Sequence, residues 1–233
     1  MHAIHIVMDQ KEVYRQYAAA YHTLTPLTSC HQELVRDTLK ALEGKKTILD
    51  AGVGTGIVAK RLAEGGHIVY GVDSSEEMLR IARTHANSEI SKGTLILSKG
   101  DILALTYSNG FFDGAVCLNV LYHLSNYKEV LAELTRTIKP EGMLVLAGPN
   151  RRIDISTFLK KIDQEYATAG IAEAYPVEVA IVKAGNAQLS DKMKTKLDAS
   201  ELSHILATFS FRIIQSHNNA YFGHSHFVVG QRT

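Results

Sequence analysis

"ILDAGVGTG", residues 48–56, joins an apolar run to an acid and then to three glycines spaced two residues apart. Glycines at this density after a strand-like segment let the backbone approach a nucleotide cofactor closely. The three glycines, Gly52, Gly54 and Gly56, form the pattern G-x-G-x-G. The last two of them, together with Ala59, also form G-x-G-x-x-A, the dinucleotide fingerprint. The loop therefore predicts a cofactor site, and the rest of the chain has to identify the cofactor.

Strand and helix signals alternate from this loop onward. The expected strands are 46–50, 67–73, 94–101, 111–119 and 142–148, and the expected helices among them are 56–66, 74–86 and 127–139. The strand segments "AVCL" and "MLVLA" are apolar without alternation, which indicates burial on both faces, as in a parallel sheet covered by helices. Such alternation predicts a doubly wound α/β sheet whose ligand lies beyond the carboxyl ends of the strands, where the glycines fall.

The last third of the chain breaks this alternation. Residues 150–197 contain helical stretches and no strand signal, and a capped helix over 198–211 follows. The two final apolar stretches pair as an antiparallel hairpin around Gly223, which completes a mostly parallel seven-stranded sheet. We therefore expect three parts: an N-terminal lid helix and cofactor-binding sheet domain over 1–149, a helical cap insertion over 150–197, and the last helix and hairpin of the sheet domain over 198–233.

The composition is that of a soluble globular protein, with 45% apolar and 21% charged residues and a formal net charge of +1 over 233 residues. Nucleic-acid binding normally shows as a basic excess, so a small or neutral binding partner is expected instead. No stretch reaches the ~18 apolar residues that cross a bilayer, and "MHAIHIVM" lacks the regions of a signal peptide. Cys30 and Cys117 form no disulfide framework, and a cytoplasmic location is expected.

Three acids narrow the choice of cofactor. Asp73 closes the second expected strand, 19 residues after Gly54, where an acid can bind both hydroxyls of a ribose in either NAD or S-adenosylmethionine. Asp50 precedes the glycines directly, which is awkward beside a pyrophosphate but suits the ammonium of an amino acid. Asp101 follows the third strand, where a carboxylate can accept a hydrogen bond from an adenine amino group. The fourth strand ends in "CLNVLYHL", with no obvious hydride-transfer catalyst, so S-adenosylmethionine is favoured.

The order of these segments resembles the class I S-adenosylmethionine-dependent methyltransferases over roughly residues 10–148 and again over 198–233. "ILDAGVGTG" is similar to their first motif, "VYGVDSSEEMLRIAR" to the second, "SKGDILAL" to the third, "FFDGAVCLNVLYHL" to the fourth and "TIKPEGMLVL" to the fifth. The similarity is greatest to the small-molecule branch that includes the ubiquinone and menaquinone methyltransferases. It implies a Rossmann-like fold and S-adenosylmethionine as the cofactor. The cofactor-binding residues implied are Asp50, Gly52, Gly54, Gly56, Asp73, Ser74, Met78, Asp101, Ile102 and Asn119.

Tyr14, Tyr17 and Tyr21 recur at spacings of three and four, which places them on one stripe of a helix. Such a stripe suits an ordinary core as well as a cofactor site. Related enzymes carry a lid helix before the sheet domain, so the resemblance implies that these rings lie against the cofactor. Electron-rich rings there would favour a sulfonium by a cation–π effect of ~0.5–2 kcal/mol.

His123 follows the fourth strand and is the candidate general base, with a hydrogen-bonded structural histidine as the alternative. A base matters only if the nucleophile starts protonated, when it adds a factor of roughly 10²–10⁴. Alignment of the reactants can supply ~7–11 kcal/mol by itself. No carboxylate or cysteine lies at a spacing from His224 and His226 that is typical of metal ligands, so no metal site is expected.

The expected function is the transfer of a methyl group to a small-molecule acceptor by in-line displacement, with N, O, S and C all open as the methylated atom. Two other functions are compatible with the same motifs. Some members of this fold bind the cofactor without methyl transfer and act as cyclases, decarboxylases or partner subunits. An NAD-linked oxidoreductase would also use a glycine loop. The segment 150–197 can cover the pocket or, alternatively, form a homodimer contact.

Overall fold

A computed structural model of this chain describes residues 10–186 and 193–233, with side chains from residue 15 onward. Its strands form one seven-stranded sheet in the order β3-β2-β1-β4-β5-β7-β6. The strands are β1 (Thr47–Ala51), β2 (Ile68–Asp73), β3 (Leu95–Lys99), β4 (Phe112–Leu118), β5 (Ile138–Pro149), β6 (Phe211–Asn219) and β7 (Ser225–Arg232). The first five pair in parallel, and β7 runs antiparallel to β5 and β6. The predicted α/β sheet with its terminal hairpin is confirmed.

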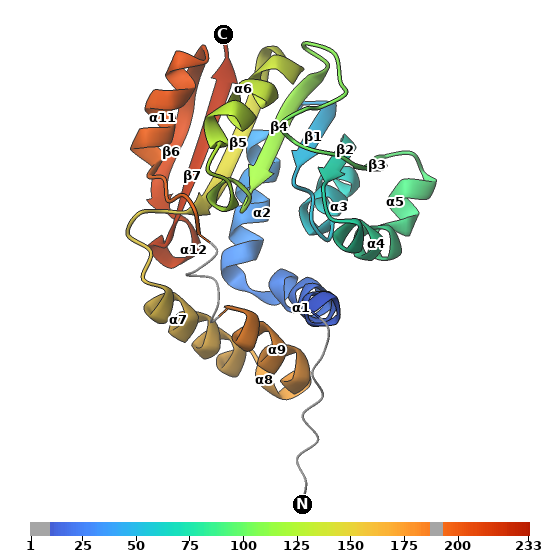
Figure 1. The fold of residues 1–233 in the computed structure, drawn as a ribbon, viewed down its shortest axis with the longest axis vertical. Coiled ribbons are helices and arrows are strands. Elements are labelled where there is room, and N and C mark those ends of the chain that lie inside the picture. The colour runs from blue at the N-terminus through green and yellow to red at the C-terminus, as the bar shows by residue number, and fades with distance from the viewer. Residues whose placement is uncertain (1–9, 187–192) are drawn as a thin grey trace, which may run out of the picture.

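Helices cover both faces of this sheet (Figure 1). One face carries α2 (Ser29–Ala41), α3 (Ile57–Glu64), α4 (Glu76–His85) and α5 (Asn87–Ser91), and the other carries α6 (Tyr127–Thr137) and α11 (Ala199–Thr208). Consecutive residues of β4 explain this arrangement. Ala115 and Cys117 lie in the core beneath α6 and α11, whereas Val116 lies in the core beneath α2 and α3. A strand buried on both faces needs an unbroken apolar run, which "GAVCL" supplies.

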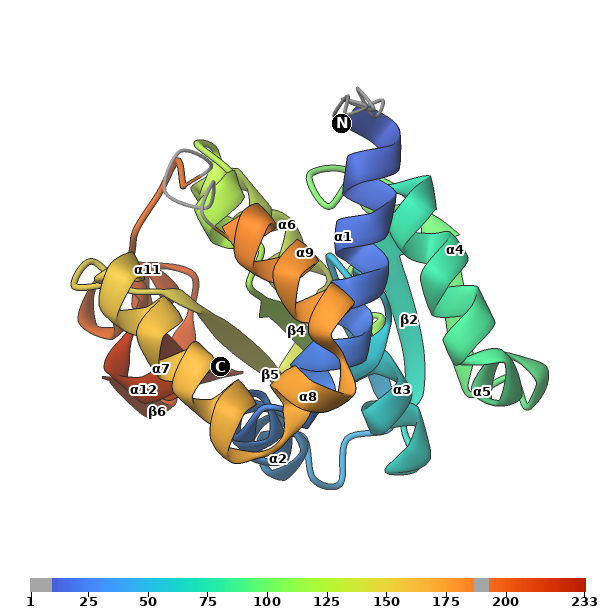
Figure 2. The same ribbon diagram turned by 90° about the horizontal axis from the view of Figure 1, so that it is seen from below.

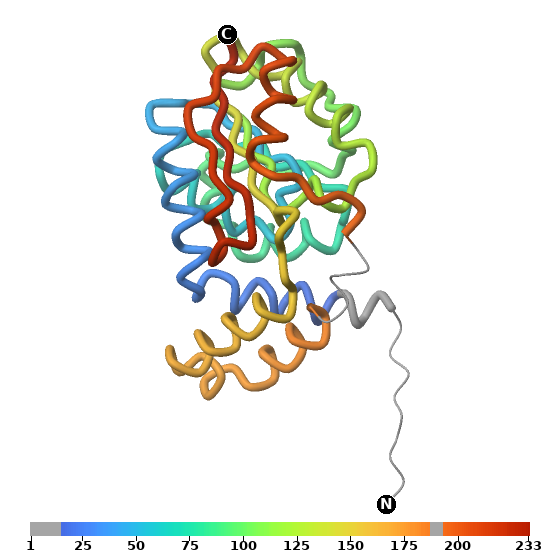
Figure 3. Tube along the Cα trace, turned by 90° about the vertical axis from the view of Figure 1, so that its left-hand side faces the viewer, coloured from blue at the N-terminus to red at the C-terminus, as the bar shows by residue number. Residues whose placement is uncertain are grey.

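A third group of helices lies across the edge of the sheet to which the β4 arrowhead points, as Figure 1 shows. It consists of α1 (Gln10–Leu24), α7 (Ile155–Thr168), α8 (Ile171–Ala174) and α9 (Pro176–Asn186), and we call it the helical layer. Figures 2 and 3 show this layer from below and from the side. Its own apolar core joins α1, through Ala20 and Leu24, to α7 and α9, through Tyr166 and Val182.

The helices α7–α9 all fall within the expected insertion 150–197. Because their core includes residues of α1, they pack on the N-terminal part of the chain rather than on each other alone. The division of the chain into three parts stays a prediction. None of the helices in the described ranges has the length and apolar character required to cross a bilayer.

Most boundaries differ by one to three residues from those expected, and the largest shift, at the start of β5, is four residues. The helix expected over 198–211 ends at Thr208, and Phe211 already belongs to β6. Helix α6 ends at Thr137 rather than at 139, and β5 begins at Ile138 and runs through Pro140. The reason is tertiary, because Ile138 pairs with Phe112 ahead of an irregularity in the β4–β5 ladder. The N-terminal region contains, besides α1, the short helix η1 (Thr25–Leu27) and α2, which the sequence did not distinguish.

Candidate functional site

The loop between β1 and α3 is built by its three glycines. Gly52, Gly54 and Gly56 have φ values of 80°, 54° and 77°, in the left-handed region that residues with a Cβ rarely adopt. At Gly52 a side chain is also excluded by space, because a Cβ there would lie 2.4 Å from Cγ2 of Val120. Val120 follows β4, so the missing side chain lets the ends of β1 and β4 approach each other.

Asp73, at the end of β2, ties this loop to the next helix. Its Oδ2 accepts a hydrogen bond from the Gly54 amide at 2.8 Å, and its Oδ1 accepts one from the Ser75 amide at 2.8 Å. An ionised carboxylate offers about four acceptor sites, so lone pairs remain on both oxygens. A ribose has two neighbouring hydroxyls, which can both donate to such a carboxylate.

Asp50, at the end of β1, is a buried carboxyl group with 4% of its surface exposed. Burial, with a smaller contribution from the negative charge of Asp73, raises its pKa from 3.8 to about 7. No donor among the described residues contacts its carboxylate. A buried charge is stable only when it is paired, so this carboxylate suits a ligand that brings a positive charge.

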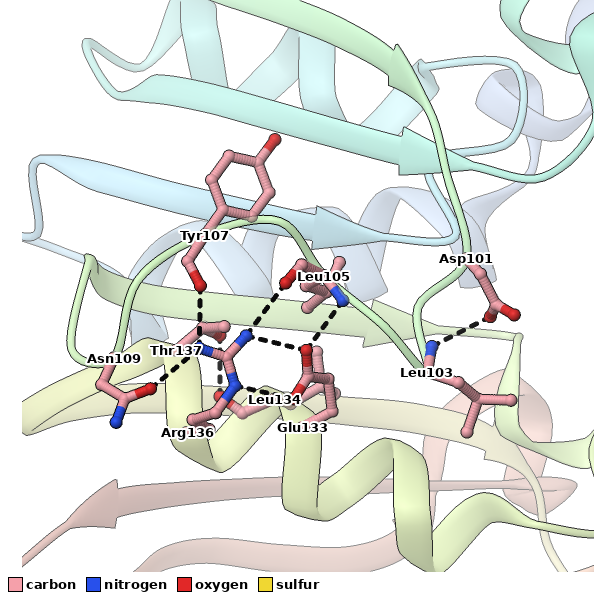
Figure 4. A network of polar contacts seen from close by, with 9 residues as sticks. All are labelled: Asp101, Leu103, Leu105, Tyr107, Asn109, Glu133, Leu134, Arg136 and Thr137. Atoms are coloured by element: carbon pink, nitrogen blue, oxygen red, sulfur yellow. Dashed lines mark hydrogen bonds and ion pairs between the residues drawn. The ribbon is translucent and has the colours of Figure 1, made fainter.

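The connection from β3 to β4 carries Asp101 and is fixed by a polar network drawn in Figure 4. Arg136 of α6 donates to the Tyr107 carbonyl at 2.8 Å and to the Leu105 carbonyl at 3.0 Å. Glu133, which accepts from Arg136 at 2.8 Å, also accepts from the Leu105 amide at 2.7 Å. This network holds the segment that follows Asp101 and Ile102 against α6.

Asp101 starts a tight turn in that segment. Its Oδ1 accepts from the Leu103 amide at 2.9 Å, and its side chain is exposed (Figure 4). Ile102 is half-buried against the core beneath α6. A turn role and an adenine contact are compatible, because the turn occupies one oxygen of the carboxylate. The adenine contact stays a prediction.

Helix α4 begins at Glu76, three residues after Asp73. The N-cap is Ser75, whose Oγ accepts a hydrogen bond from the Met78 amide at 3.3 Å, while Ser74 is exposed and Met78 is half-buried. In the first turn of α4, Oε1 of Glu77 lies 3.2 Å from Nε of Arg15, which belongs to α1. The helical layer therefore contacts α4 next to the predicted ribose site.

Asn119 follows β4 and has a left-handed backbone, with φ 58°. Its amide donates to the Ala147 carbonyl of β5 at 2.8 Å. The short helix η2 (Leu121–His123) follows. The His123 ring is exposed and lies against Tyr122, with the ring centroids 3.9 Å apart. Its role as a general base stays a prediction.

All three predicted lid tyrosines lie in α1, and the side chains of two of them are described. The Tyr17 hydroxyl donates to Oδ1 of Asn186 at 2.9 Å, and its ring covers Gly185 of α9. The Tyr21 ring stacks on that of Tyr17, with the centroids 6.1 Å apart, and burial raises the pKa of its hydroxyl. The side chain of Tyr14 lies outside the described residues. The cofactor contacts of all three stay predictions.

These positions together fit a nucleoside that carries an amino-acid group. The carboxylate of Asp50 would face the ammonium, that of Asp73 the ribose hydroxyls, and the segment from Asp101 the base. At Gly54 a Cβ would meet only the Gly52 carbonyl oxygen, at 4.0 Å, so the β1–α3 loop is open at this position. S-adenosylmethionine has each of these groups, so the residues present fit it.

Sequence reasoning did not single out two features of this edge. One is the network of Arg136 and Glu133, whose partners are carbonyls and amides that carry no sequence signal. The other is the hydrogen bond between Tyr221 and Nδ1 of His31, at 3.0 Å. These two residues are 190 positions apart, so no local pattern could have joined them.

Known proteins resemble both the sequence and the fold. Residues 49–146 match the family model described as a methyltransferase domain. A ubiquinone biosynthesis O-methyltransferase of Thiobacillus denitrificans is 34% identical over 130 residues, which is 56% of this chain and 55% of that protein. The chain thus spans about half the length of the curated relatives that it matches.

Among the solved structures that share the fold are a methyltransferase and a cyclase. Magnesium protoporphyrin IX methyltransferase of Synechocystis PCC 6803, solved with bound SAH, superposes with a TM-score of 0.66 at 20% identity and covers 94% of both chains. A structure described as the [4+2]-cyclase SpnF has a TM-score of 0.62 at 18% identity, over 94% of this chain and 95% of its own. At these identities the likeness concerns the fold alone. The resemblance predicted from the five sequence motifs is confirmed.

Proposed function

We propose that this chain carries a methyltransferase domain of the class I, S-adenosylmethionine-dependent type and that it transfers a methyl group to a small-molecule acceptor. The family match over residues 49–146 and the curated relatives named as O-methyltransferases support this proposal. The alternatives, a cofactor-binding protein without methyl transfer and an NAD-linked oxidoreductase, are not favoured.

The observation that carries the proposal is the pair of carboxylates on either side of the glycine loop. Asp50 is buried, with no donor among the described residues, and Asp73 is anchored by two backbone amides. A dinucleotide would place a pyrophosphate beside this loop, where the ionised Asp50 would repel it. A cofactor with an ammonium group and a ribose matches both acids.

S-adenosylmethionine, when bound, supplies a methyl group on a sulfonium centre. The residues of this chain hold and orient it: Asp50 pairs with the ammonium and Asp73 accepts from the ribose hydroxyls. Ser74 and the first turn of α4, which contains Met78, lie beside the ribose site, and Asp101 and Ile102 border the adenine. Asn119 closes the site from the end of β4.

The helical layer is the part of this chain that excludes water from the reacting groups. It lies across the carboxyl edge of the sheet (Figure 2), and its core unites α1 with the helices of residues 150–197. Tyr17 and Tyr21 line its inner side in this proposal. We therefore place the acceptor between this layer and the end of β4, with His123 as the base for an acceptor whose nucleophile starts protonated.

The acceptor is small and not a nucleic acid, in keeping with the net charge of +1. We further propose a cytoplasmic location, because both cysteines are free and buried. The alternative role of residues 150–197 is to form the contact of a homodimer through the helical layer.

The test is incubation of the purified protein with S-adenosylmethionine labelled in the methyl group and a metabolite extract. The proposal predicts a product that carries the label, together with S-adenosylhomocysteine, and a much lower yield with Asp73→Ala. Binding of the cofactor with no label in any extract component would indicate a cyclase, decarboxylase or partner subunit. A thermal shift with NADH and none with S-adenosylhomocysteine would indicate an oxidoreductase.

A further inference from the structure

The short turn that carries His123 cannot satisfy all of its own carbonyls. Helix η2 is a single turn, closed by hydrogen bonds from the His123 amide to the Val120 carbonyl and from the Leu124 amide to the Leu121 carbonyl, each at 3.0 Å. The last carbonyls of a helix have no partner within it. Two of the carbonyls left over are those of Tyr122 and Leu124, on either side of His123 in the chain. Whatever donates to them also holds the backbone of His123.

A distant part of the chain supplies these donors. The Tyr122 carbonyl accepts hydrogen bonds from the amides of Lys194 and Thr195, at 2.8 and 3.1 Å. The hydroxyl of Thr195 donates to the Leu124 carbonyl at 2.8 Å. Thr195 therefore contacts the backbone on both sides of His123, once through its amide and once through its side chain.

Residues 193–197, which we call the strap, are fixed at their other end to the sheet. The Leu197 carbonyl accepts a hydrogen bond from Nδ1 of His226 in β7 at 2.8 Å, and both side chains are buried, with 3% of each residue exposed. Leu197 also belongs to the core beneath α6 and α11. In the chain the strap lies between α9 and α11, so it leads from the helical layer back to the sheet. Because the strap is held at Leu197, Thr195 is a fixed donor to η2.

We propose that Thr195 is a positioning residue of the methyl transfer: it holds the turn that carries His123, so that the imidazole keeps its place beside the acceptor. This inference rests on the proposed function, since it takes His123 as the base. It gives the segment 150–197 a second role, because the part that leaves the helical layer also orients a group at the end of β4. Thr195 lies outside all five sequence motifs, 71 positions from Leu124.

The test removes the hydroxyl and keeps the shape of the side chain. At saturating S-adenosylmethionine, Thr195→Val should transfer label to the acceptor in a metabolite extract on the order of 10-fold more slowly, between the effect of one hydrogen bond and the ~10²-fold effect of a ~1 Å misplacement. Its affinity for S-adenosylhomocysteine should be unchanged in calorimetry. Thr195→Ser keeps the hydroxyl and should retain nearly the full rate. Thr135→Val is the matched control, because Oγ1 of Thr135 also donates to a carbonyl, that of Leu131 in α6 at 2.7 Å.

Amide hydrogen exchange measures the hold on the turn itself. The amides of His123 and Leu124 should exchange faster in Thr195→Val than in the unaltered chain, and as slowly as in the unaltered chain in Thr195→Ser. His123→Gln should lower the rate of transfer by at least as much as Thr195→Val does, because misplacing a group costs no more than removing it. Unchanged exchange or an unchanged rate in Thr195→Val, or a full rate in His123→Gln, would overturn the inference and leave the methyl transfer standing. No transfer of label by the unaltered chain would overturn both.

Discussion

The Asp73 carboxylate accepts a hydrogen bond from the Gly54 amide at 2.8 Å, which joins the end of β2 to the glycine loop of β1. The other oxygen of this carboxylate accepts a hydrogen bond from the amide of Ser75, the N-cap residue of α4. The acid that we assign to the ribose thus shapes the loop and the helix around it. A bond of this kind to a charged acceptor contributes about 1.5–3 kcal/mol, so Asp73 serves both the fold and the ligand.

Asp50→Asn should affect stability and affinity in opposite directions. The pKa of Asp50 is raised from 3.8 to about 7, so the folded chain binds more protons than the unfolded one between these values. Its unfolding free energy therefore falls as the pH rises from about 4 through about 7. At ~1.4 kcal/mol per pKa unit, the ionised form costs the fold on the order of 4 kcal/mol above pH 7.

Denaturant unfolding of Asp50→Asn at several pH values measures this effect. The variant should lose that pH dependence and gain stability relative to the unaltered chain as the pH rises to 8, while its affinity for S-adenosylhomocysteine falls. For the unaltered chain, affinity should decrease below pH 7, where Asp50 becomes protonated. If the unfolding free energies of the two proteins changed with pH in the same way, Asp50 would not be the buried acid with the raised pKa.

Gly52→Ala should destabilise the chain more than Gly44→Ala does. Both glycines have positive φ, 80° and 75°, so both substitutions meet the same backbone strain. Only at Gly52 does the new Cβ meet another group, Cγ2 of Val120 at 2.4 Å, whereas Gly44 has nothing within 4 Å. Thermal unfolding of the two variants compares these costs directly. The double variant Gly52→Ala with Val120→Ala should recover part of the difference, and no recovery would argue against the contact.

Acidification should destabilise the fold through histidines that are buried and neutral. Burial lowers the pKa values of His31 and His226 to about 4 each. The unfolded chain takes up these protons near pH 6.5 and the folded chain only near pH 4, so the unfolding free energy falls over that interval. Each histidine accounts for up to roughly 3 kcal/mol.

His226→Gln should therefore show a smaller decrease of stability between pH 6.5 and 4 than the unaltered chain shows. His204→Gln, which alters an exposed histidine of α11, is the control and should keep the full decrease. Identical profiles for His226→Gln and the unaltered chain would contradict the burial of a neutral His226.

Gly185→Ala should loosen the helical layer without unfolding the sheet. The added Cβ would lie 2.2 Å from Cδ2 of Tyr17, so either α9 or the Tyr17 ring has to move. Amide hydrogen exchange should become faster in α1 and α9 and stay slow in β4 and β5. Adding Tyr17→Ala should restore slow exchange in α9. Unchanged exchange in α1 would mean that this contact does not join the two helices.

Local sequence patterns were sufficient for the sheet and the glycine loop. Unbroken apolar runs such as "GAVCL" mark strands buried on both faces, and positive φ at Gly52 requires the residue that the motif supplies. The turn at Gly223 likewise follows from glycine between two apolar stretches. These features depend on residues that are neighbours in the chain.

Contacts between distant segments could not be predicted in this way. The start of β5 at Ile138 depends on pairing with Phe112, and the ring of Tyr17 covers Gly185, which is 168 positions later. Arg136 donates hydrogen bonds to backbone carbonyls. Because every residue has a backbone carbonyl, the sequence does not indicate which ones Arg136 contacts. The place of Tyr221 between two apolar stretches predicts neither its left-handed backbone nor its hydrogen bond with His31.

The most direct test of the central claim is calorimetric titration of S-adenosylhomocysteine into the unaltered chain, Asp73→Ala and Asp113→Ala. Asp113 is the matched control, because it also accepts from a backbone amide, that of Thr47 at 2.9 Å, at the opposite end of the sheet. We predict one site in the unaltered chain, affinity lower by roughly 1.5–3 kcal/mol in Asp73→Ala, and unchanged affinity in Asp113→Ala. Equal affinity in folded Asp73→Ala, or no binding by the unaltered chain, would contradict the cofactor site described here.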